Sequence, residues 1–286
     1  MRNFLIWTVV FIGIAIGLFF SIRSKANAKV NEITIHYSGA AQGDQLISKN
    51  EVLNILSKKA KKPINNTNIQ RLNFRVLEAE LNKDERIEKA DLYLDANNRL
   101  HVRILQKKPI MRVLTDTDDY YIDVNGHQIK NKPGSISRVP IVTGINETYD
   151  KAIFTNKLAK SHLKNIFEIL SKTADDEFLS ALIEQVTISQ DSLKDIVLIP
   201  KIGREKIVFG DASNIDGKIQ NLKIFYKDGL PQLGWNRYKK LNLKLGNQVV
   251  GTLINPSVAH INQPIVKRDS LTADATEIQK KISIHN

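Results

Sequence analysis

The side chains of this sequence that could do chemistry are few and scattered. No two of its six histidines have the helical spacing of metal ligands, and none opens an H-E-x-x-H motif. The sequence has no cysteine, which excludes disulfides, thiolate nucleophiles and zinc–thiolate sites. We therefore predict no metal site and no cofactor. The histidines, all expected at the surface, are His36, His101, His127, His162, His260 and His285.

Two pairs of adjacent carboxylates are the remaining candidates for catalysis. Asp118 and Asp119 are neighbours in the chain, and neighbours in a strand point to opposite faces, so they form no acid–base pair. Asp175 and Asp176 better fit the start of a helix, where negative charge is favoured. The sequence also lacks a G-x-S-x-G, Walker or G-x-G-x-x-G motif. We predict that the chain is not an enzyme and has no small-molecule substrate.

Composition predicts a globular, basic protein. Its 286 residues, 42% of them hydrophobic, suffice for one large or two modest domains. The net charge of +12 favours anionic partners. However, the lysines form only small clusters, at residues 58–62, 107–108 and 239–240, and aromatic residues do not interleave with them. A solvated surface rich in lysine is the simplest interpretation, and nucleic-acid binding is not expected.

The N-terminal segment has the pattern of a membrane anchor. Residues 4–20 are almost wholly apolar, and no charged residue lies between Arg2 and Arg23. A helix of about 20 such residues spans a bilayer. We predict a stub at residues 1–3, a transmembrane helix at 4–22 and a linker at 23–29. The expected anchor residues include Phe4, Trp7, Phe11, Phe19 and Phe20.

Two questions about this anchor stay open from the residues alone. Residues 26–28 imitate the cleavage site of a signal peptide, but the apolar run is longer than a signal-peptide core, which favours an uncleaved anchor. Arg23, Lys25 and Lys29 outnumber Arg2, so a positive-inside count would place the C-terminal part in the cytoplasm. Long domains translocate largely regardless of charge, so charge does not decide the orientation.

After the linker, the pattern predicts a small α+β unit. Residues 30–37 alternate as a half-buried strand does. A capping box at residues 48–51 opens one helix, and a second helix is expected from near Thr67. Residues 90–95 and 100–104 then alternate as two strands. The expected buried stripe of the second helix is Ile69, Leu72, Val76 and Leu77.

The following part is predicted to be mostly β. Asn125 and Gly126 indicate a tight hairpin, because both tolerate positive φ. A long final strand is expected at residues 239–252, followed by a polar tail. Helices are expected at about residues 156–171 and from Ile215 to 229–231, and strands near 184–189, 195–199 and 206–209.

Five short segments, in order, resemble those of the bacterial cell-division family FtsQ/DivIB. Residues 106–110 (QKKPI) resemble its E-R/K-x-P junction, with Gln106 in place of Glu. Residues 121–126 (YIDVNG) resemble its opening hairpin, and residues 139–144 (VPIVTG) its L-P-x-I-x-G segment. Residues 207–210 (IVFG), followed by Lys218, resemble its x-x-L-G … K segment. Residues 241–245 (LNLKL) are similar to its closing I/L-D-L-R-Y strand. The run 235–250 looks like the Bacteroidetes branch of the family.

This resemblance implies an α+β chain of two folded domains behind the anchor. A POTRA-like β-α-α-β-β domain would span residues 30–108, a mixed β-sheet domain with flanking helices 109–253, and a flexible tail 254–286. It implies a non-enzymatic divisome scaffold of the inner membrane at the septum. The N-terminus would be cytoplasmic and the domains periplasmic. FtsB/FtsL-like (DivIC-like) proteins would be its partners in regulating septal peptidoglycan synthesis.

A rival hypothesis from the residues is a POTRA-bearing protein for outer-membrane protein assembly or secretion. Such a protein would normally carry several POTRA units or lead into a membrane barrel. Only one unit is recognisable here, and no barrel-length series of strands follows.

The predicted mechanism is strand addition at the last strand, residues 239–252. An edge strand offers unpaired amides and carbonyls to another chain, and nearby lysines could steer an acidic partner. The alternative is an ordinary sheet edge protected by its lysines. A second docking surface is expected on the helix 67–81 and strand 99–106 of the first domain. The expected partner-binding residues are Trp235, Tyr238, Lys239, Lys240, Leu241, Leu243, Lys244, Leu245, Val249 and Val250, with Trp235 and Tyr238 either interface anchors or core.

Overall fold

The structure is a computed structural model that describes residues 7, 11–14, 16, 28–40, 43–156, 158–191, 194–246 and 248–255. In the stretches it describes, no helix combines the length and apolar character that a membrane span requires. Trp7 and Phe11 are helical, but Phe4, Phe19, Phe20 and the tail from residue 256 lie outside the described residues. The anchor therefore stays a prediction.

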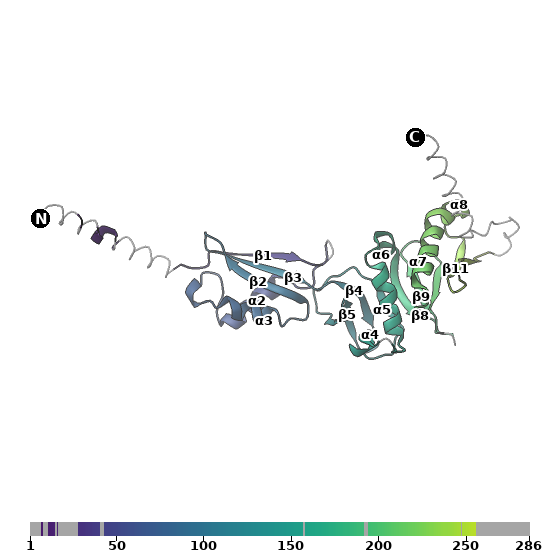
Figure 1. Ribbon diagram of the computed structural model, residues 1–286, viewed down its shortest axis with the longest axis horizontal. Helices are drawn as coiled ribbons and strands as arrows, with labels where there is room; N and C mark the ends of the chain where they lie inside the picture. The colour runs from purple at the N-terminus through teal and green to yellow at the C-terminus, as the bar shows by residue number, and fades with distance from the viewer. Residues whose placement is uncertain are drawn as a thin grey trace, which may run out of the picture. The chain divides into compact units, whose positions relative to one another are not determined.

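The chain forms two compact units (Figure 1). The first comprises Met1–Lys108 and Lys132–Ser137, and the second comprises Pro109–Asn131 and Arg138–Asn286. The prediction of an α+β chain with a small first sheet and a large mixed second sheet is confirmed.

The first unit is a three-stranded sheet with helices on one face (Figure 1). The strand order is β1-β3-β2, with β1 parallel and β2 antiparallel to the central β3. Alternate residues of these strands pack with the helices in one apolar core. The elements are β1 (Glu32–Ser38), α2 (Lys49–Ala60), the 3-10 helix η1 (Ile69–Arg71), α3 (Phe74–Leu81), β2 (Ile87–Leu94) and β3 (Arg99–Gln106).

The capping box at the start of α2 is confirmed. Ser48 accepts from the amide of Glu51, whose carboxylate accepts in turn from the amide of Ser48. The second predicted helix is wrong in its start. Asn68 caps η1, and Asn73 caps a separate α3 by accepting from the amide of Val76. Because α3 begins anew at this second cap, its buried face differs from the predicted stripe, and Val76 is exposed.

Arg86 lies at the centre of a buried polar network in the first unit. Its guanidinium donates to both carboxylate oxygens of Asp84, at 2.8 and 2.9 Å, and to Glu51 at 2.7 Å. It also donates to the carbonyl of Leu46. Gln106 completes the network, because its Oε1 accepts the amide of Leu46 at 2.7 Å. The glutamine that replaces Glu in the junction segment therefore still offers the acceptor oxygen that this position uses.

The segment Lys132–Ser137 belongs to the first unit although it follows β6 in the chain. Gln45 and Ile136 form an antiparallel bridge, and Ser135 donates to the carbonyl of Leu46. Lys132 reaches Asp84 at 3.1 Å. A single boundary after residue 108 therefore does not describe the division into units, since this later segment returns to the first.

The second unit is a nine-stranded mixed sheet among the described residues, in the order β12-β11-β10-β9-β8-β7-β4-β5-β6. Parallel pairs are β4/β7, β7/β8 and β10/β11. The strands are β4 (Pro109–Leu114), β5 (Asp119–Asp123), β6 (Gln128–Lys130), β7 (Ile141–Thr143), β8 (Ile183–Ile188), β9 (Ile196–Pro200), β10 (Lys206–Gly210), β11 (Tyr238–Asn242) and β12 (Val250–Leu253). The helical segments are α4 (Ala152–Thr155), α5 (His162–Thr173), α6 (Glu177–Leu182), α7 (Ile215–Ile224), the π-helical η2 (Phe225–Gly229) and α8 (Leu230–Leu233).

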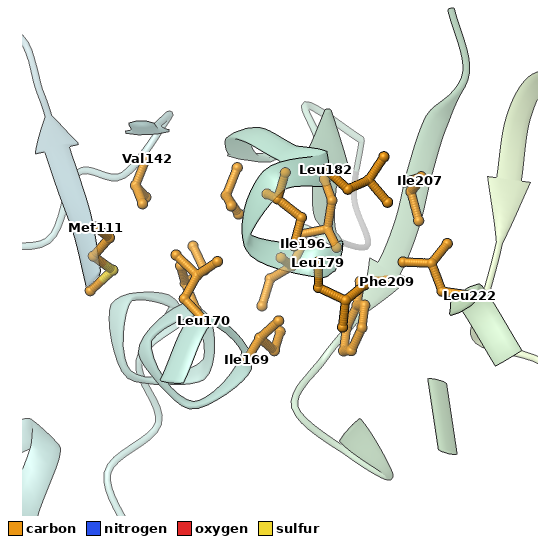
Figure 2. Packing of buried hydrophobic residues seen from close by; sticks show 14 of the residues in the cluster. Met111, Val142, Ile169, Leu170, Leu179, Leu182, Ile196, Ile207, Phe209 and Leu222 are labelled. Atoms are coloured by element: carbon orange, nitrogen blue, oxygen red, sulfur yellow. The ribbon is translucent and has the colours of Figure 1, made fainter. Parts of the chain in front are cut away.

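One continuous core holds this sheet to its helices. Figure 2 shows Met111 and Val142 on one side of the helices, and Ile207 and Phe209 on the other. Leu170 of α5 lies between them (Figure 2). Phe209 is fully buried, so β10 cannot shift without disturbing this core.

Three local predictions in the second unit need correction. The hairpin at residues 123–127 is confirmed, but only Gly126 has positive φ there, and Asp123 stabilises the turn by accepting the amides of Asn125 and His127. The helix expected from residue 156 begins at His162, since Ser161 is its N-cap. The last helix does not stop at residues 229–231, because Pro231 lies in the first turn of α8, where no amide is needed. Asp176 caps α6, as predicted.

Candidate partner-binding edge of the second unit

The C-terminal strands form a hairpin at one end of the sheet. The prediction of one long strand over residues 239–252 is wrong, because β11 ends at Asn242 and the chain turns back into β12. Asn242 accepts the amide of Lys244, and Gly246 adopts positive φ, which together favour a turn after the alternating leucines.

This turn moves the unpaired edge from β11 to β12. β11 is bonded on one side to β10 and on the other to β12, so its backbone has no free side. In the described sheet, β12 has only β11 as a neighbour. Alternate residues of β12 therefore direct their amides and carbonyls away from the sheet.

The structure separates the ten predicted partner-binding residues into two groups. Tyr238, Leu241 and Leu243 are core residues, which decides the open question for Tyr238. Val249 packs partly against the core, and Lys244 forms an ion pair with Asp195 at 2.9 Å. The exposed members are Trp235, Lys239, Lys240, Lys244, Leu245 and Val250, with Trp235 47% exposed.

A tyrosine ring covers the middle of the edge strand. Gly251 is paired with Leu241, and a Cβ added to Gly251 would lie 2.4 Å from the ring of Tyr238. No real contact is that short, so only glycine lets β12 approach β11 beneath this ring. The glycine thus allows the final strand to join the sheet.

Replacing Gly251 with Val is expected to destabilise the second unit by about 1–3 kcal/mol, because the side chain would displace Tyr238. Denaturant unfolding followed by the fluorescence of Trp235 measures this. Thr252→Val is the matched control, since Thr252 is exposed in the same strand. Equal stability of the two variants would show that Tyr238 does not restrict this position.

A row of cations leads across the sheet to this edge. Lys206 of β10 is paired with Lys240 of β11, and Lys240 is paired with Thr252 of β12. Both lysines are exposed, and neither has an ion pair with a described residue. Like charges on paired positions repel, so the sheet alone does not account for this arrangement. Lys206 was missed in the sequence, because nothing there indicates that β10 and β11 are neighbours.

Trp235 is supported by a buried polar pair. The hydroxyl of Tyr226 donates to the Glu205 carboxylate, and both side chains are buried. Burial, followed by the adjacent Glu205, raises the pKa of Tyr226 above its usual range. Tyr226 in turn packs edge-to-face with Trp235 at 6.3 Å between ring centroids. This chain of contacts connects the β9–β10 loop to the residues that precede β11.

Two further residues of the family-like segments stabilise the neighbouring backbone. Lys218 is buried, donates to the carbonyl and carboxylate of Asp211, and lies 5.0 Å from the centre of the Phe209 ring. Hydrogen bonding from Ser213, with help from Lys218, lowers the pKa of Asp211 to about 2. Gly210 has positive φ, and a Cβ there would meet the Lys244 side chain at 2.8 Å. These residues have a structural role.

Within the described ranges, no group of three or more His, Cys, Asp or Glu side chains could hold a metal ion. One member of each carboxylate pair has a structural role: Asp119 pairs with Arg112, and Asp176 caps α6 and bonds Lys223. The β12 edge, in contrast, offers unpaired backbone groups, exposed apolar side chains and nearby cations. These features suit the binding of another polypeptide chain.

Two family models match the sequence. One, described as a POTRA-like domain, covers residues 29–105. The other, described as FtsQ/DivIB, C-terminal related, covers residues 108–252, more than half of the chain. The chain belongs to the FtsQ/DivIB family. A search of curated proteins gave no match.

FtsQ/DivIB membership indicates a cell-division scaffold that interacts with other division proteins. The family is one of non-enzymatic scaffolds, and it suggests a membrane protein of the division site. The β12 edge lies within the part of the chain that matches the FtsQ/DivIB model.

Proposed function

We propose that this FtsQ/DivIB protein is a membrane-anchored divisome scaffold whose β12 edge receives a strand from an FtsB/FtsL-type (DivIC-type) partner. Through this contact it helps to regulate septal peptidoglycan synthesis. Residues 4–22 form its anchor, with the N-terminus in the cytoplasm and both folded units in the periplasm. The observation that carries the proposal is the place of β12, a terminal strand of the described sheet in the FtsQ/DivIB-type unit.

Three properties of the edge support strand addition. Its backbone has a free side, which supplies main-chain hydrogen bonds to an added strand. Val250 is 40% exposed in the strand, and Ile254, directly after it, is 43% exposed, so apolar contacts flank the backbone. Lys240 of the neighbouring β11, and Lys206 of β10 one strand further, place positive charge near it, which favours a partner strand with acidic side chains.

β12 lacks two features that often protect an edge strand from pairing with another chain, namely charged residues and prolines. Edges are often protected by inward-pointing charges or prolines, but β12 has the sequence VGTL. Charged residues lie on β10 and β11 instead of on the edge strand itself. This distribution favours a binding edge over an ordinary protected one.

Leu253→Pro tests strand addition directly. Ile254 donates its amide to the carbonyl of Arg237 at 3.0 Å, so the alternation of the strand directs the amide of Leu253 away from β11. Proline removes this outward donor, and the partner's affinity is expected to fall about tenfold or more. Binding of the purified partner ectodomain to the full chain gives the measurement.

Leu253→Ala is the matched control, because it shortens the same side chain and keeps the amide. It should lose clearly less affinity than Leu253→Pro. Thermal unfolding of both variants verifies that the second unit is intact. A folded Leu253→Pro protein that binds its partner as the unchanged chain does would rule out strand addition at β12.

A further inference from the structure

A basic cluster lies where the chain enters the first unit. Ala28 and Val30 are hydrogen-bonded to the segment that follows α2. The amide of Ile69 donates to the carbonyl of Ala28 at 2.9 Å, and the amide of Val30 donates to the carbonyl of Thr67 at 2.9 Å. The amide of Asn66 completes this contact by donating to Val30. The entering chain and the end of α2 therefore form one surface.

This surface has an excess of positive charge. Residues 1–31 and 52–77 contain no Asp or Glu. Lys59 is paired with Glu80, but the other cations of this surface have no ion pair with a described residue. We call them the entry cluster: Lys29, Lys58, Lys61, Lys62 and Arg71.

Ordinary helix chemistry explains only part of the entry cluster. Cations in the last turn of a helix interact favourably with its dipole, which accounts for Lys58. Lys61 is different, because it has φ of 57° and caps the helix in the left-handed conformation. Glycine or asparagine is preferred at this position. A lysine there adopts a strained backbone conformation, and it has no ion pair with a described residue.

The length of the linker determines what this surface can meet. The predicted anchor ends at residue 22, and five residues, 23–27, precede Ala28, the first residue that is hydrogen-bonded within the first unit. Fully extended, they reach about 17 Å. The entry cluster is thus held close to the membrane surface, where anionic headgroups attract lysines over roughly a Debye length of 8 Å.

We infer that the entry cluster docks the first unit onto anionic phospholipid headgroups. This inference depends on the predicted anchor but not on the binding of a partner to β12. Docking would restrict the tilt of the first unit at the membrane. The ligand class is the phosphodiester headgroup of a lipid such as phosphatidylglycerol.

The test uses the full chain, in which a single engineered cysteine is unique because the chain has none. Asn65→Cys, exposed beside the cluster, carries a fluorophore. The protein is reconstituted into nanodiscs of phosphatidylcholine, with or without phosphatidylglycerol, and with a quencher on some headgroups. We expect stronger quenching with phosphatidylglycerol, and its loss at high salt.

The variant Lys58→Gln/Lys61→Gly/Lys62→Gln removes three charges while relieving the strain at residue 61. Each lysine is expected to contribute about fivefold to docking, so the docked-to-undocked ratio should fall about a hundredfold. Lys160→Gln/Lys172→Gln/Lys227→Gln removes three exposed charges from the second unit and should leave quenching unchanged. The melting temperature of the test variant should not decrease.

Flotation of the full chain with vesicles at high salt separates the possible failures. A chain that floats but shows the same quenching in both lipids keeps its anchor and overturns the docking inference. A chain that does not float contradicts both the anchor and the inference. A third outcome is that quenching is the same in both lipids while the chain binds purified peptidoglycan and the test variant does not. This outcome would assign the cluster to the cell wall and overturn lipid docking.

Discussion

Arg86→Met is expected to lower the free energy of unfolding of the first unit by about 3 kcal/mol. The Arg86 side chain is only 2% exposed, and its removal leaves the Asp84 and Glu51 carboxylates without their principal cation. Breaking a buried ion pair typically costs about 3–5 kcal/mol. The lower end applies because Asp84 keeps Lys132 at 3.1 Å and Glu51 is partly exposed.

The pH dependence of this loss provides an internal check. Burial alone would raise the pKa of Asp84, but hydrogen bonds and charge from Arg86 outweigh it and hold the pKa well below the usual 3.8. A carboxyl group whose pKa is lower in the folded state stabilises the fold at every pH above its unfolded-state pKa. This stabilisation is lost as the pH falls through the folded-state pKa. The difference in the free energy of unfolding between the unchanged chain and Arg86→Met should therefore be largest near neutral pH and shrink below about pH 4.

Hydrogen exchange of the β2 and β3 amides measures the first unit separately from the second. Lys59→Met is the matched control: it breaks an ion pair with Glu80 whose members are 38% and 28% exposed. Such surface pairs contribute little, so this variant should keep the protection of the unchanged chain. Equal protection in the Arg86 variant would show that the network does not stabilise the unit.

Lys206→Glu is expected to weaken partner binding about tenfold at low salt without destabilising the fold. The substitution replaces repulsion between paired Lys206 and Lys240 with attraction, so stability should be unchanged or slightly higher. A partner strand with acidic side chains would meet reversed charge on β10, two strands from β12, and associate more slowly. The effects on stability and on binding thus have opposite signs.

Association kinetics at several salt concentrations measure this effect, which should diminish as salt screens the charges. Lys172→Glu is the control, because Lys172 is exposed on α5 and lies outside the β12 edge. Association of the Lys206 variant at the unchanged rate would exclude charge steering at this row, although strand addition itself would still stand on the Leu253 test.

Local signals in the sequence determined many of the elements. The Ser48–Glu51 capping box, the strand alternation of the first unit and the turn at Gly126 depend on neighbours within a few residues, so their physics is visible in the chain. Errors arose where two local signals competed. Asn73 reset a helix that the apolar spacing favoured continuing, and Pro231 was accommodated because it fell in a first turn.

The candidate site depended on pairings between distant residues. The leucines 241 and 243 alternate in the same way whether β11 is an edge or an interior strand, because alternation reports only which side chains face the core. Only the folded sheet shows that β12 covers β11, that Tyr238 lies over Gly251 and that Lys206 lies beside Lys240.

The sequence by itself therefore determined the family resemblance, the α+β character and the C-terminal region as the place to look. Tertiary structure decided which strand has a free backbone. The physical reason is that side-chain patterns are written along the chain, whereas strand order and register come from hydrogen bonds between segments far apart in it, such as β10 and β11.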